Sequence, residues 1–276
     1  VEPHASGIIA EVNAIKGEEY TPLAKTKQGK VTKLGKEMDK VYLARVQTLM
    51  LQPELLKDLH AKKLKIVYTA LHGAGGVLVP VILKKLGFNF FTVPKQDVFD
   101  GRFPTVESPN PENAPALAMA VELANEKKAD IVIGTDPDCD RMGVGVRDER
   151  GKMTLLTGNQ TGSLIAWYRI KTMFELGILN EKNKKNAVLL KTFVTSPMQD
   201  AIAHHFGINV VNTLTGFKWI SAKLQKYEDK LPKAIRFFFT EPFWTDPVLP
   251  NQTPELGTTT LYLPLGGMKS TARQLA

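Results

Sequence analysis

Three aspartates alternate in the segment Asp136-Pro-Asp-Cys-Asp140, and Arg141 follows them directly. Alternate side chains of an extended turn point the same way, so Asp136, Asp138 and Asp140 can converge on one point. Carboxylates held this close repel one another unless a cation neutralises them. Such hard oxygen ligands suit magnesium, which usually keeps water or phosphate oxygens in its remaining positions. The spacing therefore predicts a Mg²⁺ site for phosphoryl transfer, with Arg141 placed to bind a phosphate.

Three other interpretations of this acidic segment compete with the magnesium site. An EF-hand calcium loop fails, because Arg141 and Arg147 stand where that loop requires glycine and glutamate. A phosphatase with Asp136 as its nucleophile also places an aspartate after a strand, and this minor alternative stays open. The third is a solvated acidic turn. Single acidic turns are common, but three alternating aspartates and an arginine after an apolar strand are unusual, so we give this interpretation low weight.

The elements around this segment alternate between strands and helices from residue 64 onward. Apolar runs and β-branched residues predict strands, and apolar spacing near 3.6 predicts helices. The predicted strands are 64–70, 88–93, 129–135, 142–147, 153–156, 187–192, 208–212 and 234–239. The predicted helices are 38–50, 77–86, 113–127, 159–176, 197–206 and 217–227. This rhythm predicts an α/β fold of two related domains with mainly parallel, mixed sheets.

A glycine-rich turn follows the first predicted strand, in the segment Thr69-Ala-Leu-His-Gly-Ala-Gly-Gly76. Its glycines could let backbone amides approach an anion, although a tight turn between strand and helix explains them equally well. His72 in this turn fits a hydrogen-bonded histidine of the core at least as well as a catalytic residue.

Several segments, in this order and spacing, resemble the α-D-phosphohexomutase superfamily. Its metal-binding loop resembles Gly134–Val144, with a departure at Cys139, where a small residue is usual. The other matching segments are Pro3-His, Gly7–Val12, Thr69–Gly76, Phe103–Val106, Pro109–Glu112, Thr154–Gln160 and Thr213–Ile220. The resemblance runs from residue 1 to residue 241 and favours the phosphoglucomutase or phosphopentomutase branch, with only the middle domains present.

The resemblance implies a reaction and a set of site residues. The family moves a phosphoryl group between two sugar hydroxyls, as between glucose 1-phosphate and glucose 6-phosphate through glucose 1,6-bisphosphate. By resemblance, the three aspartates hold the magnesium that also binds a phosphoserine, and Arg141 contacts phosphate. The other residues expected at the phosphosugar by resemblance are His72, Gly73, Thr215, Gly216, Lys218 and Glu241.

The chain also departs from the family pattern. None of its six serines is followed by His-Asn, as the family's phosphoserine is, so we expect no catalytic serine here and no mutase activity from this chain alone. Pro242 stands where the family has a serine in the loop around Glu241, which puts sugar binding by that loop in doubt. A non-catalytic relative that binds magnesium and phosphosugars, or that works only with a partner, is the main alternative, and a phosphopentomutase is a further one.

These observations predict four parts of the chain. Residues 1–40 form an extended remnant that follows a catalytic-serine domain, and residues 41–157 form the domain with the metal loop. Residues 158–245 form the sugar-recognition domain, and residues 246–276 form an atypical, irregular tail.

The bulk composition fits an ordinary soluble globular protein better than a nucleic-acid or membrane protein. The net charge is +8, but the lysines are scattered rather than clustered with aromatic residues, so no nucleic-acid partner is expected. No apolar run is long enough to span a bilayer. The single cysteine excludes an internal disulfide, and the start of the sequence does not resemble a signal peptide. We therefore expect a cytoplasmic protein without a membrane partner.

Overall fold

The computed structural model describes residues 3–17, 24–58, 63–230, 238–240 and 260–262 of the chain. Two compact units cover Val1–Met38 and Asp39–Ala276. The first unit contains α1 (His4–Ala14) and the short 3-10 helix η1 (Lys25–Lys27). The prediction of an extended lead-in is therefore wrong for α1, whose three alanines and glutamate favour a helix without any clear apolar periodicity.

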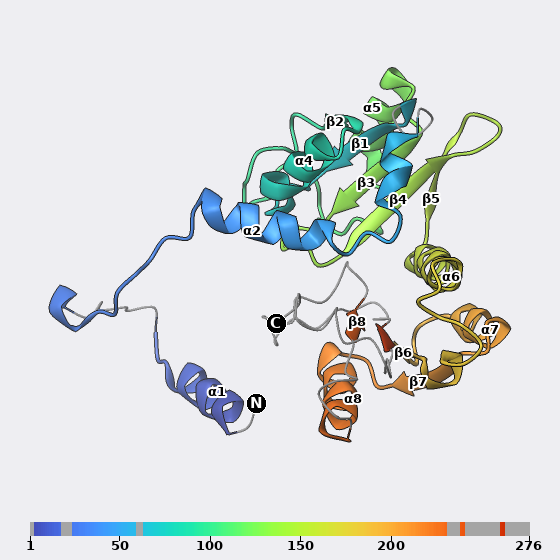
Figure 1. The fold of residues 1–276 in the computed structure, drawn as a ribbon. Helices are drawn as coiled ribbons and strands as arrows, with labels where there is room; N and C mark the ends of the chain where they lie inside the picture. The colour runs from blue at the N-terminus through green and yellow to red at the C-terminus, as the bar shows by residue number, and fades with distance from the viewer. Residues whose placement is uncertain (1–2, 18–23, 59–62, 231–237, 241–259, 263–276) are drawn as a thin grey trace. The chain divides into compact units, whose positions relative to one another are not determined.

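The first α/β domain carries a five-stranded mixed sheet (Figure 1). Its helices are α2 (Lys36–Gln47), η2 (Pro53–Lys57), α4 (Gly75–Lys85) and α5 (Ala118–Lys127). Its strands are β1 (Lys65–Thr69), β2 (Asn89–Thr92), β3 (Ile131–Thr135), β4 (Met142–Arg147) and β5 (Met153–Leu156). The strand order is β2-β1-β3-β4-β5, in which β2, β1 and β3 are parallel and β4 and β5 are antiparallel.

Helices cover both faces of this sheet because β1 alternates its side chains between them. Val67 packs with Ala120 and Ala124 of α5 on one face. Tyr68 belongs to the cluster that contains Leu83 of α4 on the other face. The result is a three-layered domain in which the carboxyl ends of the parallel strands β1 and β3 share one edge.

The second α/β domain carries a four-stranded mixed sheet of order β7-β6-β9-β8. Its helices are α6 (Gly158–Glu175), η3 (Lys184–Asn186), α7 (Met198–His205) and α8 (Phe217–Lys230). Its strands are β6 (Val188–Thr192), β7 (Asn209–Thr213), β8 (Phe238–Thr240) and β9 (Thr260–Tyr262). Only β6 and β7 are parallel, and β9 pairs antiparallel with both β6 and β8. Leu189 and Leu190 of β6 belong to the two clusters that contain residues of α6 and α7 and of α8, respectively.

The predicted α/β fold with mixed sheets is confirmed, and two further predictions about single elements are wrong. Helix α5 begins at Ala118 rather than at Asn113, because residues 111–117 form successive turns. The tail was predicted to be irregular, but Thr260–Tyr262 form β9, for which a threonine, a leucine and a tyrosine are favourable strand residues. The rest of the tail and Glu241 lie outside the described residues. Among the described helices, none has the length and apolar character needed to cross a membrane.

Candidate functional site

The acidic loop, residues 136–141, begins directly after β3 and brings the three predicted carboxylates together. One oxygen from each of Asp136, Asp138 and Asp140 lies within 4.8 Å of the others. Asp136 is buried, Asp140 is half-buried and Asp138 is exposed. The loop is closed by its own backbone, since the Cys139 amide donates to the Asp136 carbonyl (3.0 Å) and the Arg141 amide donates to Asp136 Oδ1 (2.9 Å). Asp136 is therefore both the first residue of the turn and the group that the turn orients.

The electrostatics of the loop favour a cation among the carboxylates. Burial, together with the neighbouring acids, raises the pKa of Asp136 to about 7. Burial also raises the pKa of Asp140, with a contribution from the charge of Asp138. Arg141 offers partial compensation, because its Nε lies 3.6 Å from Asp136 Oδ2 and 3.8 Å from Asp140 Oδ1. A divalent cation would remove the repulsion that remains.

Among the described residues, one carboxylate oxygen of the cluster is buried without a hydrogen bond. Asp140 Oδ1 is buried, and it accepts no hydrogen bond from the described part of the chain. A buried carboxylate oxygen without such a bond is costly, unless an ion or another polar group contacts it. Since the donor set consists only of carboxylate oxygens, it suits a hard cation such as Mg²⁺.

The glycine-rich turn after β1 packs against the acidic loop. The Ala74 amide donates to the Pro137 carbonyl at 2.7 Å. A β-carbon at position 73 would lie 2.2 Å from the Pro137 Cα, and one at position 75 would lie 2.3 Å from Tyr68 Oη. Gly73 therefore permits a close approach between two backbone segments, and Gly75 leaves room for the Tyr68 hydroxyl, which favours the tight-turn interpretation of this segment.

Both ring nitrogens of His72 make hydrogen bonds inside the protein. His72 is 2% exposed, and its Nδ1 lies 2.9 Å from the Val98 carbonyl oxygen. A carbonyl can only accept, so Nδ1 donates, and Nε2 lies 2.8 Å from Thr105 Oγ1, from which it accepts when the ring is neutral. Gln96 Nε2 in turn donates to Thr105 Oγ1, and Thr69 Oγ1 donates to Gln96 Oε1. This continuous network favours the core-histidine alternative over contact with a substrate.

Of the described residues predicted to meet a sugar in the second domain, Thr215 and Gly216 lie between β7 and α8, and Lys218 is the second residue of α8. Thr215 and Lys218 are exposed, whereas Gly216 is buried and has a φ of +116°, a conformation that glycine adopts without strain. Lys218 Nζ lies 5.2 Å from the centroid of the Trp219 ring. Because β6 and β7 are parallel, this loop lies at the edge of the sheet where open α/β sheets bind ligands.

Sequence reasoning did not find Lys191, which ends up buried near the same edge of the second sheet. The available signal was a charged residue inside the predicted strand 187–192, a place where an unpaired ammonium is costly.

Two family models match the chain. The model described as phosphoglucomutase/phosphomannomutase, alpha/beta/alpha domain II, matches residues 40–151. The model of domain III of the same family matches residues 157–232. The chain belongs to the phosphoglucomutase/phosphomannomutase family. The acidic loop lies in the domain II match, and Thr215, Gly216 and Lys218 lie in the domain III match.

Individual members of the family agree with this assignment. A phosphoglucomutase of Staphylococcus aureus (strain MRSA252) is 36% identical over 189 residues, which cover 66% of this chain and 33% of the relative. The phosphoglucomutase of strain USA300 matches with the same identity and coverage. The chain thus spans about a third of the length of the curated relatives that it matches.

Solved structures of the phosphoglucomutase/phosphomannomutase family share the fold. A crystal structure of a family protein from Burkholderia thailandensis matches with a TM-score of 0.52 and 18% identity, over 68% of this chain and 36% of its own. A crystal structure from Thermus thermophilus has a TM-score of 0.52 and 19% identity, over 69% of this chain and 39% of its own.

Proposed function

We propose that this chain is the metal-binding and sugar-recognising part of a phosphohexomutase of the phosphoglucomutase type. The observation that carries the proposal is the convergence of Asp136, Asp138 and Asp140 within 4.8 Å at the carboxyl end of β3. Relatives named phosphoglucomutase, at 36% identity, support glucose phosphates as the substrates. The reaction would move a phosphoryl group between two hydroxyls of glucose 1-phosphate and glucose 6-phosphate, through glucose 1,6-bisphosphate.

In this proposal the acidic loop holds Mg²⁺ through its three aspartates. When bound, the ion supplies positive charge that neutralises the negative charge developing on the transferred phosphoryl oxygens. Arg141 binds a phosphate oxygen, and its contacts with Asp136 and Asp140 keep the guanidinium beside the carboxylates. Burial of Asp136 excludes water from one side of the cluster, which strengthens these interactions.

Recognition of the sugar is assigned to the second domain. The exposed Thr215 hydroxyl and Lys218 ammonium offer hydrogen bonds to sugar hydroxyls or phosphate, and the left-handed Gly216 sets the direction of the loop between them. Glu241 is assigned the same role from the family resemblance alone. No serine of the sequence has the Ser-His-Asn context of the family's phosphoryl donor. We therefore propose that this chain alone binds the phosphosugar but does not catalyse phosphoryl transfer.

The phosphatase alternative finds less support in the geometry. A nucleophilic aspartate must approach phosphorus in line with the leaving oxygen. Asp136 is 4% exposed, and its Oδ1 accepts a hydrogen bond from the backbone of its own loop. The more exposed Asp138 is better placed to meet a phosphate-bound ion.

The test combines binding with a coupled mutase assay on the purified chain. Calorimetry should show that glucose 1,6-bisphosphate binds in the presence of Mg²⁺, that binding fails for Asp138→Ala, and that the exposed control Glu149→Gln binds normally. Conversion of glucose 1-phosphate to glucose 6-phosphate should stay at the background rate. Turnover that disappears in Asp138→Ala would show a working mutase and contradict the assigned lack of a nucleophile. Phosphate release that needs Asp136 would show a phosphatase, and the absence of any phosphosugar binding would overturn the proposal.

A further inference from the structure

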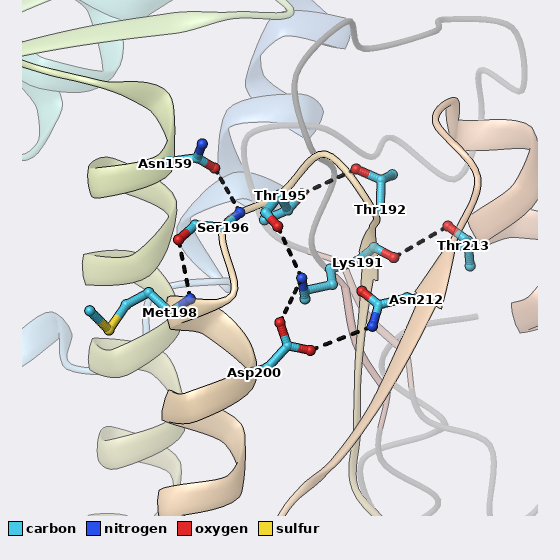
Figure 2. Close-up of polar contacts among 9 residues, drawn as sticks. All are labelled: Asn159, Lys191, Thr192, Thr195, Ser196, Met198, Asp200, Asn212 and Thr213. Atoms are coloured by element: carbon cyan, nitrogen blue, oxygen red, sulfur yellow. Dashed lines mark hydrogen bonds and ion pairs between the residues drawn. The ribbon is translucent and has the colours of Figure 1, made fainter.

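A buried lysine and a partly exposed aspartate form an ion pair in the second domain (Figure 2). Lys191, at the carboxyl end of β6, is 2% exposed. Its Nζ lies 2.8 Å from Asp200 Oδ2 on α7 and donates to the Thr195 carbonyl at 3.1 Å. An ammonium buried without an anion carries a large desolvation cost, so the charge of Asp200 is what keeps Lys191 in this place.

The ion pair joins the β6–α7 loop, residues 193–197, to two secondary-structure elements. Through the Thr195 carbonyl, Lys191 ties the middle of the loop to β6, and Thr195 also shares a hydroxyl hydrogen bond of 3.1 Å with Thr192. Through Asp200 the loop is tied to α7. The end of the loop is fixed separately, because the Ser196 amide donates to Asn159 Oδ1 of α6 at 2.9 Å (Figure 2).

The same ion pair contacts the strand that leads into the sugar loop, residues 214–216. Asn212 Nδ2 lies 3.5 Å from Asp200 Oδ1, and Thr213 Oγ1 donates to the Lys191 carbonyl at 3.4 Å. The Phe193 amide donates to the Thr213 carbonyl at 3.0 Å. The β6–α7 loop and the sugar loop therefore start from neighbouring strand ends, at the carboxyl edge of β6 and β7.

Burial of side chains does not hold the tip of the β6–α7 loop. Phe193 and Val194 are 68% and 58% exposed, and Met198 at the start of α7 is 58% exposed. With little apolar burial at its tip, the loop depends on its polar anchors for a defined conformation. The Lys191–Asp200 pair is the charged anchor among them.

We infer that Asp200 is a positioning residue, which acts through Lys191 to fix both loops at the sugar-facing edge of the second domain. The inference rests on the proposed function of that edge. A buried ion pair adds little net stability compared with well-packed apolar residues. In this domain, however, its contacts join β6, the β6–α7 loop, α7 and the end of β7. Asp200 does not contact the phosphosugar in this account. Its loss acts by releasing the ammonium of Lys191 and, with it, the β6–α7 loop and the end of β7.

The test measures loop order and ligand affinity separately in the full chain. In Asp200→Asn, amide hydrogen exchange should rise at least about tenfold in residues 193–197 and 214–216, while peptides of β1 and β3 keep their wild-type rates. Affinity for glucose 1,6-bisphosphate with Mg²⁺ should fall by about tenfold or more, because a small displacement of binding groups has a large effect. Asp200→Glu should restore much of both, since it returns the negative charge. Glu175→Gln, which removes the exposed Lys171–Glu175 pair, serves as the matched control and should change neither.

Each outcome decides the inference. If Asp200→Asn fails to fold, the double variant Lys191→Met with Asp200→Leu removes both charges, and it should fold with faster exchange in both loops. Wild-type exchange in both loops of either folded variant would overturn the inference. A uniform rise across the second domain, with unchanged phosphosugar affinity in the folded protein, would show a merely structural pair and would also overturn it. If the wild-type chain binds no phosphosugar, the proposed function fails. The exchange result still tests whether the Lys191–Asp200 pair orders the two loops.

Discussion

Gly73 and Pro137 approach so closely that a β-carbon on residue 73 would lie 2.2 Å from the Pro137 Cα. The contact is between backbone atoms, which cannot rotate away as a side chain can. It is reinforced by the hydrogen bond from the Ala74 amide to the Pro137 carbonyl. The turn after β1 therefore packs directly against the acidic loop, and the loop's shape depends on a glycine far away in the sequence.

Replacing this glycine should disturb both stability and metal binding. Gly73→Ala forces the turn and the acidic loop apart, and we expect it to lower the free energy of unfolding by about 1–3 kcal/mol. It should also weaken Mg²⁺ binding, because Pro137 lies between two of the aspartates. Gly101→Ala is the matched control, since a β-carbon there meets nothing within 4 Å. Chemical denaturation that gives equal results for the two variants would contradict the close packing.

At position 139, glycine should give a more stable protein than alanine, which reverses the usual order of these two residues. The φ of Cys139, +63°, is left-handed, which costs about 1 kcal/mol for a residue with a β-carbon. Cys139→Gly should therefore be more stable than Cys139→Ala by about 1 kcal/mol, although both lose the same thiol. Urea denaturation of the pair measures the difference directly. An alanine variant as stable as the glycine variant would show that the loop is not strained at this residue.

The acidic loop could be found from sequence because its chemistry lies in six consecutive residues. Strands β4 and β5 were predicted with their observed bounds, because apolar and β-branched residues mark them plainly. The Lys191–Asp200 pair could not be found, since it joins a strand to a helix and depends on tertiary structure. The hydrogen bonds of His72 could not be predicted either, because its partners Val98 and Thr105 lie 26 and 33 residues further along the chain.

The raised pKa of Asp136 predicts an unusual pH dependence for the metal-free chain. Its pKa rises from 3.8 to about 7 on folding, so the folded state binds this proton more tightly than the unfolded state. The free energy of unfolding should therefore fall as pH rises from about 4 to about 7, by on the order of 2–4 kcal/mol from this group. Asp136→Asn, which mimics the protonated form, should lack this component.

Denaturation curves of both proteins at several pH values isolate the contribution of Asp136. The wild-type curve minus the variant curve should slope downward with pH in metal-free buffer. Saturating Mg²⁺ should reduce that slope, since the ion competes with the proton for the same oxygens. A difference that rises with pH without metal would mean that Asp136 is stabilised in its charged form.

Substitution of His72 distinguishes a structural role from contact with a ligand. His72→Ala leaves the Val98 carbonyl and the Thr105 hydroxyl without their buried partner and creates a cavity, so we expect a loss of about 2–4 kcal/mol in unfolding free energy. Affinity for glucose 1,6-bisphosphate, measured well below the melting temperature, should change little. Normal stability with a large loss of affinity would place His72 at the substrate instead.

The central claim is that Asp136, Asp138 and Asp140 form one divalent-cation site, and calorimetric titration of the chain with Mg²⁺ tests it most directly. Asp138 is the exposed member of the cluster, so Asp138→Ala removes a ligand without opening the core. The wild-type chain and Glu149→Gln should each bind one ion, weakly, because the phosphate ligand is missing. Asp138→Ala should show no binding, and equal binding by all three proteins would contradict the account.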